Sequence, residues 1–580
     1  MSDQKNMILA MALALLVFVG WDLLVLAPER EAREQAAQNQ PATSDQTATP
    51  APDPGQAAPP VLDADANADA VGAMTSALKP RADALADSPR VMIETPRLTG
   101  SIALTGARFD DLVLVDYWET VEQTAQIKLL NPAGAEDAYF AEFGWTAAAS
   151  AGLRLPGRND RWIADRPRLT PQQPVTLRFD NGQGLIFTRT ISVDEDFMFT
   201  IEQQVENTSG VPVTLAPYAL ISRTGTPKTS QLFVIHEGPL GVLDGTLSEI
   251  DYDELREESP IEQQSKGGWL GITDKYWLTT LVPDQDRAFR ARFLHGGGVI
   301  DRYQVDFREE AITLASGESA KVDNRFFAGA KEVKLIDRYA EQYGITRFDR
   351  TIDWGWFYFL TRPIFFVLDL CYRLLGNFGV AIIALTFLVR LLMFPLANKQ
   401  FESMSRMRKV QPKMKALQER FKDDKMRLQQ ELMALYKREK VNPLAGCLPI
   451  LVQIPVFFAL YKVLLVTIEM RHAPFFGWIA DLSAPDPLTP VNLFGLLPFT
   501  PPSFLAIGIW PIIMGVSMWL QMRLNPTPPD PIQARIFGLM PFIFTFILAP
   551  FAVGLVVYWT CNNLLSIAQQ WIIMRRIERE

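Results

Sequence analysis

The polar and apolar positions of this chain follow two different patterns. Between residues 91 and 330, short runs alternate apolar and polar side chains and are separated by turn residues. The clearest run, residues 197–206, places alternate side chains on one face: Phe197, Phe199, Ile201 and Val205. A period of two predicts strands with one buried face, and several such strands in succession predict an antiparallel β-sandwich. Residues 331–347 have a helical pattern, so we expect residues 91–350 to form a sandwich with a C-terminal helix.

The second pattern is a series of apolar runs of the kind that cross a bilayer. They cover residues 7–27 and about 376–397, 444–468, 504–523, 536–550 and 553–574. We therefore expect a polytopic α-helical membrane protein with six spans that carries the β-sandwich as a separate domain. The run 536–550 is about 22 Å long as a helix, shorter than the ~30 Å hydrocarbon core, which predicts local thinning of the bilayer or a buried polar neighbour.

Three segments join these domains. Residues 1–28 predict an uncleaved signal anchor; a cleaved signal peptide is the alternative, although no convincing cleavage site follows the apolar run. Residues 29–90 are rich in Ala, Pro, Gln, Asp and Thr and lack aromatic residues, which predicts a disordered tether. Residues 351–375 are aromatic and apolar but contain Arg362 and Asp369, which favours an interfacial amphipathic helix over a transmembrane one.

The distribution of charge predicts the orientation. Residues 398–440 carry thirteen Lys and Arg against six Asp and Glu, so the positive-inside rule places them in the cytoplasm. The same rule places residues 524–535 and the C-terminus there. With six spans, the N-terminus is then cytoplasmic and the β-sandwich lies in the periplasm of a bacterium. Apolar side chains at helical spacing predict that residues 398–440 form a helical hairpin.

Arg390 is the most informative single residue. It lies within the apolar run 379–396, where a charge costs roughly 2.5–3.5 kcal/mol on insertion scales. One interpretation is an anchor whose side chain reaches toward the helix end at Asn398; the other is a polar cavity inside the membrane. The other spans contribute further polar side chains, namely Thr386, Gln453, Ser517, Gln521, Asn562, Asn563, Ser566 and Gln569. These residues either form ordinary hydrogen bonds between helices or converge with Arg390 on a hydrated groove.

The motifs of common enzymes are missing from the sequence. It contains no G-x-x-x-x-G-K-[ST] motif and no metal-ligand spacing, so we expect no cofactor, no nucleotide hydrolysis and no enzymatic activity. A transporter or channel is one alternative, but we find no internal repeat among the spans. A periplasmic sensor is another, and a sugar-binding or enzymatic role of the β-sandwich is a third.

Six stretches resemble the YidC family of bacterial membrane protein insertases. They are KGGWLGITDKYW (266–277), DWGWFYFLTRP (353–363), GNFGVAIIALTFLVRLLMFPL (376–396), the basic segment with the span that follows it (417–461), APFFGWIADLSAPDP (473–487) and GLVVYWTCNNLLSIAQQ (554–570). The resemblance runs from the signal anchor to the C-terminus and is weakest in the tether and the β domain. It implies a five-helix core with a hydrophilic groove that is open to the cytoplasm and to lipid and closed to the periplasm.

The resemblance also assigns residues. The family's groove arginine maps onto Arg390, and we expect the groove to include Thr386, Gln453, Gln521, Asn562 and Ser566. Substrate contact is expected at Phe387, Tyr558 and Trp559, although Trp559 stands where a Tyr is common. In the hairpin, contacts with the ribosome, the client or lipid are expected at Arg406, Arg408, Lys409, Lys413 and Lys415.

The implied function is insertion and folding of integral inner-membrane proteins. Its expected partners are nascent membrane proteins, the Sec translocon with its accessory components, the ribosome with the signal recognition particle pathway, and the phospholipid bilayer. A monomer is the expected working unit. The tail after Trp571 is short, so we do not expect the C-terminus to bind the ribosome.

Overall fold

The computed structural model describes residues 78–229, 235–298, 300–421, 424–439, 448–494, 496–497, 501, 506–524 and 531–579. The predicted signal anchor and most of the predicted tether lie outside these residues. Ser403–Pro443 belong to one structural unit, and the β domain and the remaining helices form another. Each unit is described separately below.

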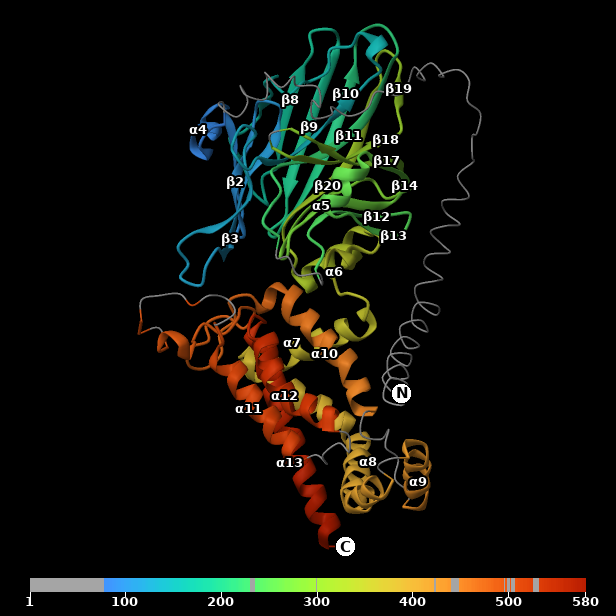
Figure 1. Ribbon diagram of the computed structural model, residues 1–580. Helices are drawn as coiled ribbons and strands as arrows, with labels where there is room; N and C mark the ends of the chain where they lie inside the picture. Colours follow the sequence, from blue (N-terminus) through green and yellow to red (C-terminus); the bar gives the residue numbers. More distant parts are fainter. Residues whose placement is uncertain are drawn as a thin grey trace, which may run out of the picture. The chain divides into compact units, whose positions relative to one another are not determined.

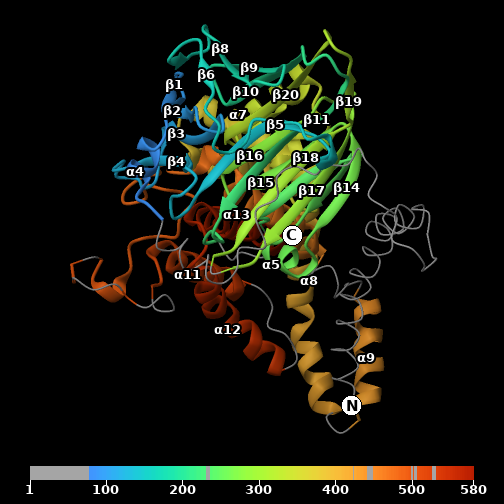
Figure 2. The same ribbon diagram turned by 90° about the horizontal axis from the view of Figure 1, so that it is seen from above.

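The β domain contains two sheets in the described part of the chain. The first has the order β14-β17-β18-β11-β5-β3-β2-β1-β7, with β19 beside β11 and β4 beside β3. Its strands are β1 (Arg90–Glu94), β2 (Leu98–Ala103), β3 (Arg108–Trp118), β4 (Gln126–Leu130), β5 (Tyr139–Thr146), β7 (Arg168–Leu169), β11 (Val213–Thr224), β14 (Ile261–Lys266), β17 (Ala288–Gly296), β18 (Arg302–Glu309) and β19 (Ile312–Leu314). Figure 2 shows β11, β18, β17 and β14 side by side.

The second sheet has the order β13-β12-β15-β16-β20-β10-β9-β8-β6. Its strands are β6 (Ile163–Ala164), β8 (Val175–Asp180), β9 (Leu185–Val193), β10 (Met198–Asn207), β12 (Gly238–Leu243), β13 (Thr246–Glu249), β15 (Gly268–Thr273), β16 (Trp277–Val282) and β20 (Ser319–Ala330). Strand β10 has the predicted alternation, because Phe199, Ile201 and Val205 are buried and Glu206 is exposed. Asp194 closes the turn before it by accepting bonds from the amides of Asp196 and Met198.

The core of the β domain lies between the two sheets. Phe109 of the first sheet contacts Phe199 and Phe326 of the second, with ring centroids 5.3 and 5.5 Å apart. Phe143 of the first sheet lies 6.1 Å from Phe326 in an edge-on arrangement. Edge-on aromatic pairs of this kind add roughly 0.5–1.5 kcal/mol each to the burial of the rings themselves. The two sheets therefore pack face to face, as the sandwich prediction requires.

Two details of this domain differ from the prediction. Strands β1 and β7 pair in parallel, whereas the other strand pairs of the described sheets are antiparallel. The predicted tether was also too long, because residues 78–90 are structured and include helix α4 (Arg81–Ala86). Arg81 holds this segment on the sheet through Asp111 and through the carbonyl of Leu130, at 2.7 Å. Because this stretch has few apolar residues, the sequence did not reveal that it is attached to the sheet by charged and polar contacts of Arg81.

Helix α6 (Val333–Tyr343) and the 3₁₀ turn η3 (Phe348–Thr351) connect the last strand to the helical part of the same unit. Two further short elements, α5 (Tyr252–Glu258) and η2 (Ala149–Ala151), lie between strands of the β domain. Figure 1 shows α6 between the strands and the helices. Helix α6 ends at Gly344, which adopts the left-handed conformation that glycine favours at a helix C-terminus. The predicted C-terminal helix of this domain is therefore α6.

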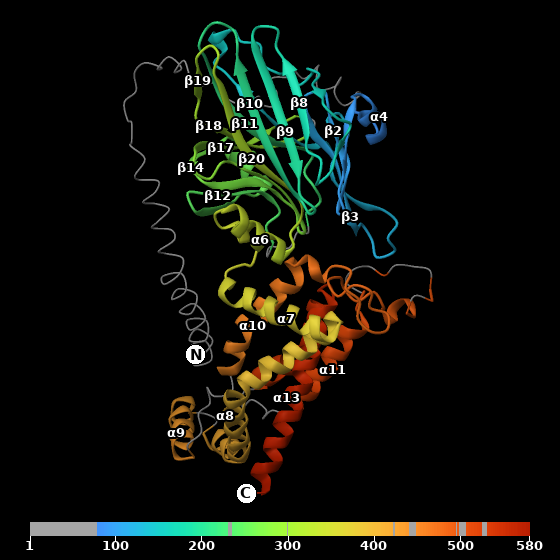
Figure 3. The same ribbon diagram turned by 180° about the vertical axis from the view of Figure 1, so that it is seen from behind.

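The helical core comprises α7 (Tyr358–Leu375), the first part of α8 (Phe378–Arg420), α10 (Leu448–Val466), α11 (Ile509–Leu524), α12 (Pro531–Leu548) and α13 (Val553–Arg579). The 3₁₀ turns η5 (Ile468–Met470) and η6 (Pro490–Asn492) lie between α10 and α11. Figure 3 shows α11 and α13 side by side. Among the described residues, Phe378–Asn398 is long and apolar enough to cross a membrane, and Gln453–Val466 and Ala534–Leu548 are shorter apolar helices. The number of six spans therefore stays a prediction.

Two predicted helix boundaries are wrong. Helix α8 does not end near Asn398 but continues to Arg420, because most of the residues after Pro395 are good helix formers, although Pro412 lies among them. Helix α12 begins at Pro531, earlier than the predicted 536, and proline suits the first helical position. The apolar part of α12, Ala534–Leu548, is nevertheless about 22 Å long, so the expectation of a span shorter than the hydrocarbon core stays a prediction.

The second unit contains the end of α8 and helix α9 (Lys425–Arg438). The Asp424 side chain accepts a bond from the amide of Arg427 at 3.0 Å and so caps α9. Val410 and Met414 of α8 pack against Leu435 of α9. The predicted pairing of two helices is therefore present in this unit.

Candidate functional site

Arg390 of α8 is bonded to helix α13. Its Nε donates to the Asn562 side-chain oxygen at 2.8 Å, and one terminal nitrogen donates to the Asn562 carbonyl at 3.1 Å and to the Ser566 hydroxyl. All three acceptors are uncharged. Among the described residues no Asp or Glu pairs with Arg390, so its positive charge is hydrogen-bonded but not neutralised.

The acceptors lie on one face of α13 because of their spacing. Tyr558, Asn562 and Ser566 follow one another at intervals of four residues, which aligns them along the helix. Further along, Gln569 donates to Asn398 of α8 at 2.9 Å. Asn562, Ser566 and Gln569 therefore tie α13 to α8 over about two turns.

Helix α10 joins the same stripe. The Gln453 amide donates to the Tyr558 hydroxyl, so two predicted site residues from different helices meet directly. We call Arg390, Gln453, Tyr558, Asn562 and Ser566 the polar cluster. It combines one cation with several neutral donors and acceptors, which suits a hydrated site for polar or anionic groups.

The other predicted site residues have different surroundings. Thr386 is fully buried and its hydroxyl donates to the Ile382 carbonyl one turn earlier, which is a local role within α8. Trp559 packs against Phe457 and Phe544, with ring centroids 4.7 and 5.6 Å away. Phe387 is 58% exposed and lies on the outer surface of α8.

Gln521 is partly buried on α11, and no hydrogen bond links it to the polar cluster in the described part of the chain. The bond that α11 does make to α13 runs from the Asn563 amide to the Ser517 hydroxyl, at 3.0 Å, and both residues are buried. These two polar residues therefore hold helices together on a different side of α13.

The predicted contact residues of the hairpin lie on its exposed side. Arg406, Lys409, Lys413 and Lys415 are exposed, and the side chain of Arg408 lies outside the described residues. Lys413 pairs with Glu439 at 2.8 Å, which joins α8 to the end of α9. The exposed Arg and Lys side chains described above form a basic surface on this unit.

The sequence analysis missed Lys462, another charged residue in an apolar helix. Its ammonium group lies 2.7 Å from Asp353, which also accepts bonds from the amides of His236 and Gly355. Asp353 thus links the β domain, the segment before α7 and the end of α10. The signal was present in the sequence, because the argument applied to Arg390 holds equally for a lysine inside the run 444–468.

A second link between the β domain and the helical core is Glu469 of η5. Its carboxylate accepts the amide of Val333 at the start of α6, at 3.1 Å, while its other oxygen is buried without a hydrogen-bond partner among the described residues. Burial raises the pKa of Glu469 to about 7, and the neighbouring Glu332 and Asp369 act in the same direction. The protonation of this group therefore changes close to neutral pH.

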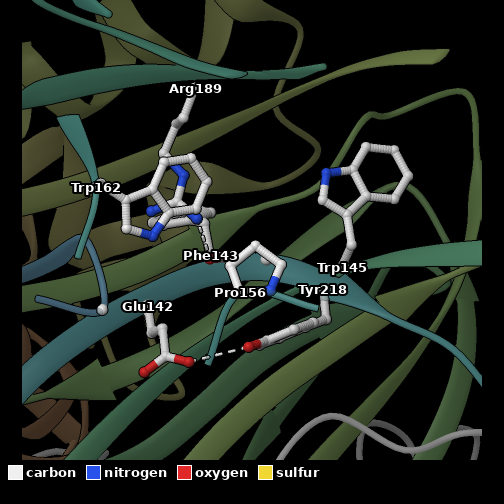
Figure 4. A pocket seen from close by; sticks show the side chains of 9 residues that line it. Glu142, Phe143, Trp145, Pro156, Trp162, Arg189 and Tyr218 are labelled. Carbon is white, nitrogen blue, oxygen red and sulfur yellow. Dashed lines mark hydrogen bonds between the residues drawn. The ribbon is translucent and has the colours of Figure 1, made fainter. Parts of the chain in front are cut away.

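The β domain also has a small pocket, shown in Figure 4, lined by Glu142, Trp162, Arg189 and Tyr218 among others. Tyr218 donates to Glu142 at 2.9 Å, and Arg189 lies over the Trp162 ring. The pocket leaves about 10 Å³ for the centre of a water molecule, which is room for about one water. This pocket is too small for a sugar ring.

No group of three or more potential metal ligands occurs among the residues that the structure describes.

Two family models match the chain. The 60Kd inner membrane protein family covers residues 370–580, and the YidC periplasmic domain covers residues 90–367. Together they assign the helical core and the β domain to separate families of known location.

Curated relatives match nearly the whole chain. The membrane protein insertase YidC of Methylorubrum extorquens is 51% identical, and that of Beijerinckia indica subsp. indica is 52% identical; each match covers 99% of this chain and 96% of the relative. Among solved structures, an active YidC insertase with its first transmembrane domain resolved is 18% identical, covers 83% of this chain and 92% of its own, and has a TM-score of 0.35.

These matches define the class of protein first. It is an inner membrane protein with a periplasmic domain rich in antiparallel strands. At 51% identity over almost its full length, the chain belongs to the YidC family of membrane protein insertases. Its role is accordingly the insertion of proteins into the membrane and not enzymatic catalysis, which decides against the transporter and sensor alternatives.

Proposed function

We propose that the polar cluster receives the short external segment of a client protein while the client's apolar helix moves into lipid along the outside of α8 and α13. The observation that carries this proposal is the charge of Arg390, which is bonded only to neutral acceptors among the described residues. An acidic client segment supplies the missing negative charge. A hydrated cluster also lowers the desolvation cost of that segment, because each buried unpaired polar group is costly.

The surface beside the cluster suits the apolar part of the client. Phe387, Leu391 and Leu392 of α8 are 58%, 61% and 77% exposed. These side chains lie next to Arg390 in sequence, so a client helix against them would keep its polar end close to the guanidinium. Partitioning of about 20 apolar residues into lipid supplies the driving force. The membrane potential adds roughly 2.3 kcal/mol per charge per 100 mV and favours outward movement of acidic residues.

The proposal includes a topology. Six spans place both termini in the cytoplasm, the β domain in the periplasm, and the opening of the groove on the cytoplasmic side. The exposed basic surface of the hairpin, which includes Arg406, Lys409 and Lys415, then faces the cytoplasm, where it meets anionic lipid, nascent chains or ribosomal RNA. We further propose that the chain works as a monomer, alone or with the Sec translocon, and receives clients from ribosomes through the signal recognition particle pathway.

The experiment measures insertion of a single-span client with an acidic external tail into proteoliposomes that contain only this protein. Protease protection of the tail reports insertion. We expect Arg390→Ala to slow insertion at least about tenfold, because a hydrogen bond to a charged group is worth roughly 1.5–3 kcal/mol. Arg390→Lys keeps the charge and should retain most of the activity.

Arg523→Ala is the matched control. Arg523 lies at the end of α11, where its guanidinium lies 3.9 Å from the centre of the Trp519 ring, and no hydrogen bond or ion pair among the described residues joins it to the polar cluster. It should leave insertion unchanged. A client whose acidic tail residues are replaced by Asn should lose its sensitivity to Arg390→Ala. Equal insertion by all variants with the acidic client would contradict the proposed role of Arg390.

A further inference from the structure

The loop between α10 and α11 exposes a group of large apolar side chains that do not belong to any membrane helix. We call residues 476–497 the apolar loop. Its exposed members are Phe476 (65%), Trp478 (39%), Val491 (42%), Leu493 (52%), Phe494 (52%), Leu496 (82%) and Leu497 (40%). Soluble proteins rarely expose so many apolar side chains together, and such a patch marks an interaction surface.

The loop has no charge over its second half. No charged residue occurs between Asp486 and Arg523, a stretch that includes the rest of the loop and most of α11. Loops that face water are normally rich in polar and charged residues. Helix α11 continues the apolar surface, because Ile513 and Val516 are 41% and 58% exposed. The described part of the loop after Asp486 and α11 up to Arg523 therefore both expose apolar side chains and carry no charge.

Part of the backbone at the end of the loop is paired within the loop. The amides of Leu493, Phe494, Leu496 and Leu497 donate to carbonyls within the loop, at 3.0 to 3.2 Å. The Asp486 carboxylate accepts the indole of Trp478, near the start of the loop, at 2.9 Å and the amide of Trp510, in α11, at 2.8 Å. A non-helical segment tolerates apolar surroundings only when its amides are paired in this way.

Two exposed apolar residues of the loop have a strained backbone conformation. Leu493 and Phe494 have φ angles of 51° and 60°, in the left-handed region that large side chains rarely adopt. Both residues nevertheless point outward, as their exposure shows. Strained residues persist where the surrounding structure holds them for a purpose.

The position of the loop identifies what covers it. Arg471, just before the loop, donates to the Glu119 carbonyl of the β domain at 3.2 Å, so this end of α10 lies on the side of the β domain. Figures 1 and 3 show the orange loop beside the helices at that end. We propose that the apolar loop is embedded in the interfacial region of the periplasmic leaflet and attaches the insertase to lipid in addition to its membrane helices. The choice of leaflet rests on the topology given under Proposed function.

The test places a nitroxide label at single cysteines in the full-length protein, reconstituted in lipid nanodiscs of phosphatidylethanolamine and phosphatidylglycerol. The three native cysteines, Cys371, Cys447 and Cys561, are replaced by alanine. Collision of the label with oxygen, which concentrates in lipid, is compared with collision with a water-soluble nickel chelate. Leu496→Cys and Val491→Cys carry the label in the loop, and Val491→Cys keeps the test valid if one label perturbs the turn.

Two sites calibrate the measurement. Phe542→Cys on α12, 60% exposed, reports a membrane helix, and Val211→Cys in the β domain, 57% exposed, is an apolar residue facing water. We expect the ratio of oxygen to nickel collisions at Leu496 to be several-fold higher than at Val211 and to approach that at Phe542. The idea is overturned if both loop labels collide with nickel as readily as Val211 does. Shielding from both reagents with dipolar coupling between labels would also overturn it, in favour of a second copy as the occupant.

A failed test of the loop is distinguishable from a failure of the proposed function. The labelled Leu496→Cys protein is assayed for client insertion in parallel, and this assay depends on Arg390 and not on the loop label. An active protein whose loop label faces water refutes the lipid attachment alone.

Discussion

The β domain and the helical core place polar and apolar side chains in opposite ways. In the β domain most of the largest buried side chains are aromatic, such as Phe109, Phe143 and Phe199, which are at most 1% exposed. In the helical core, Leu392 and Phe542 are 77% and 60% exposed, whereas Ser566 is 1% exposed. The difference follows from the solvent of each region: exposing an apolar side chain to water is unfavourable, whereas exposing it to the apolar lipid tails is not.

This contrast separates the forces that hold the two regions together. Burial of apolar surface stabilises the β domain by roughly 25 cal/mol per Å². Helices in lipid gain little from such burial and depend on close packing and on hydrogen bonds between helices. The polar cluster is therefore both a candidate site and part of what joins α8, α10 and α13.

The strongest test of the contrast compares two apolar truncations. Phe326→Ala in the sandwich should destabilise the β domain by roughly 3–5 kcal/mol, because the ring is fully buried among three other rings. Leu392→Ala on α8 should cost less than about 0.5 kcal/mol. Hydrogen exchange of β10, β20 and α8 in the full-length protein measures both. Similar costs at the two sites would mean that Leu392 is packed against protein and not lipid.

The next test concerns the boundary between the regions and depends on pH. The pKa of Glu469 is about 7 in the folded protein and about 4.5 when exposed, so the folded state binds more protons between these values. Stability at this contact is therefore greatest below pH 4.5 and falls as the pH rises toward 7, by up to about 3 kcal/mol. Protection of the Val333 amide, corrected for intrinsic exchange, should fall over this range.

Glu469→Gln should remove that dependence and strengthen the contact at pH 8, because the amide remains an acceptor for Val333 and carries no charge. Glu257→Gln, an exposed carboxylate on α5, is the matched control and should change nothing. Unaltered pH dependence in Glu469→Gln would assign the effect to another group.

The smallest effect is expected between helices in lipid. Asn563→Ala and Ser517→Ala each remove the bond between α13 and α11. Hydrogen bonds between membrane helices average about 0.6 kcal/mol and reach about 1.7. A double-mutant cycle on unfolding in bicelles should give a coupling energy in this range. A coupling above about 2 kcal/mol would show that polar contacts dominate the stability of the core.

The prediction from sequence succeeded where the pattern is local. The alternation in β10 was readable because it depends on neighbouring side chains. Helix ends were less accurate, because the span up to 397 and the helical hairpin 398–440 were predicted separately, whereas α8 continues through both to Arg420. The start of the folded β domain was also missed, because the contact of Arg81 with Asp111 joins residues far apart in sequence.

For the candidate site, the sequence by itself determined that a charge lies in an apolar helix and that Tyr558, Asn562 and Ser566 share a helix face. Composition and periodicity are enough for both. The tertiary structure decided which acceptors meet Arg390, that Gln453 bonds to Tyr558, and that Lys462 pairs with Asp353. Such pairs join different helices or domains, and their choice depends on how the elements pack, for which no local pattern exists.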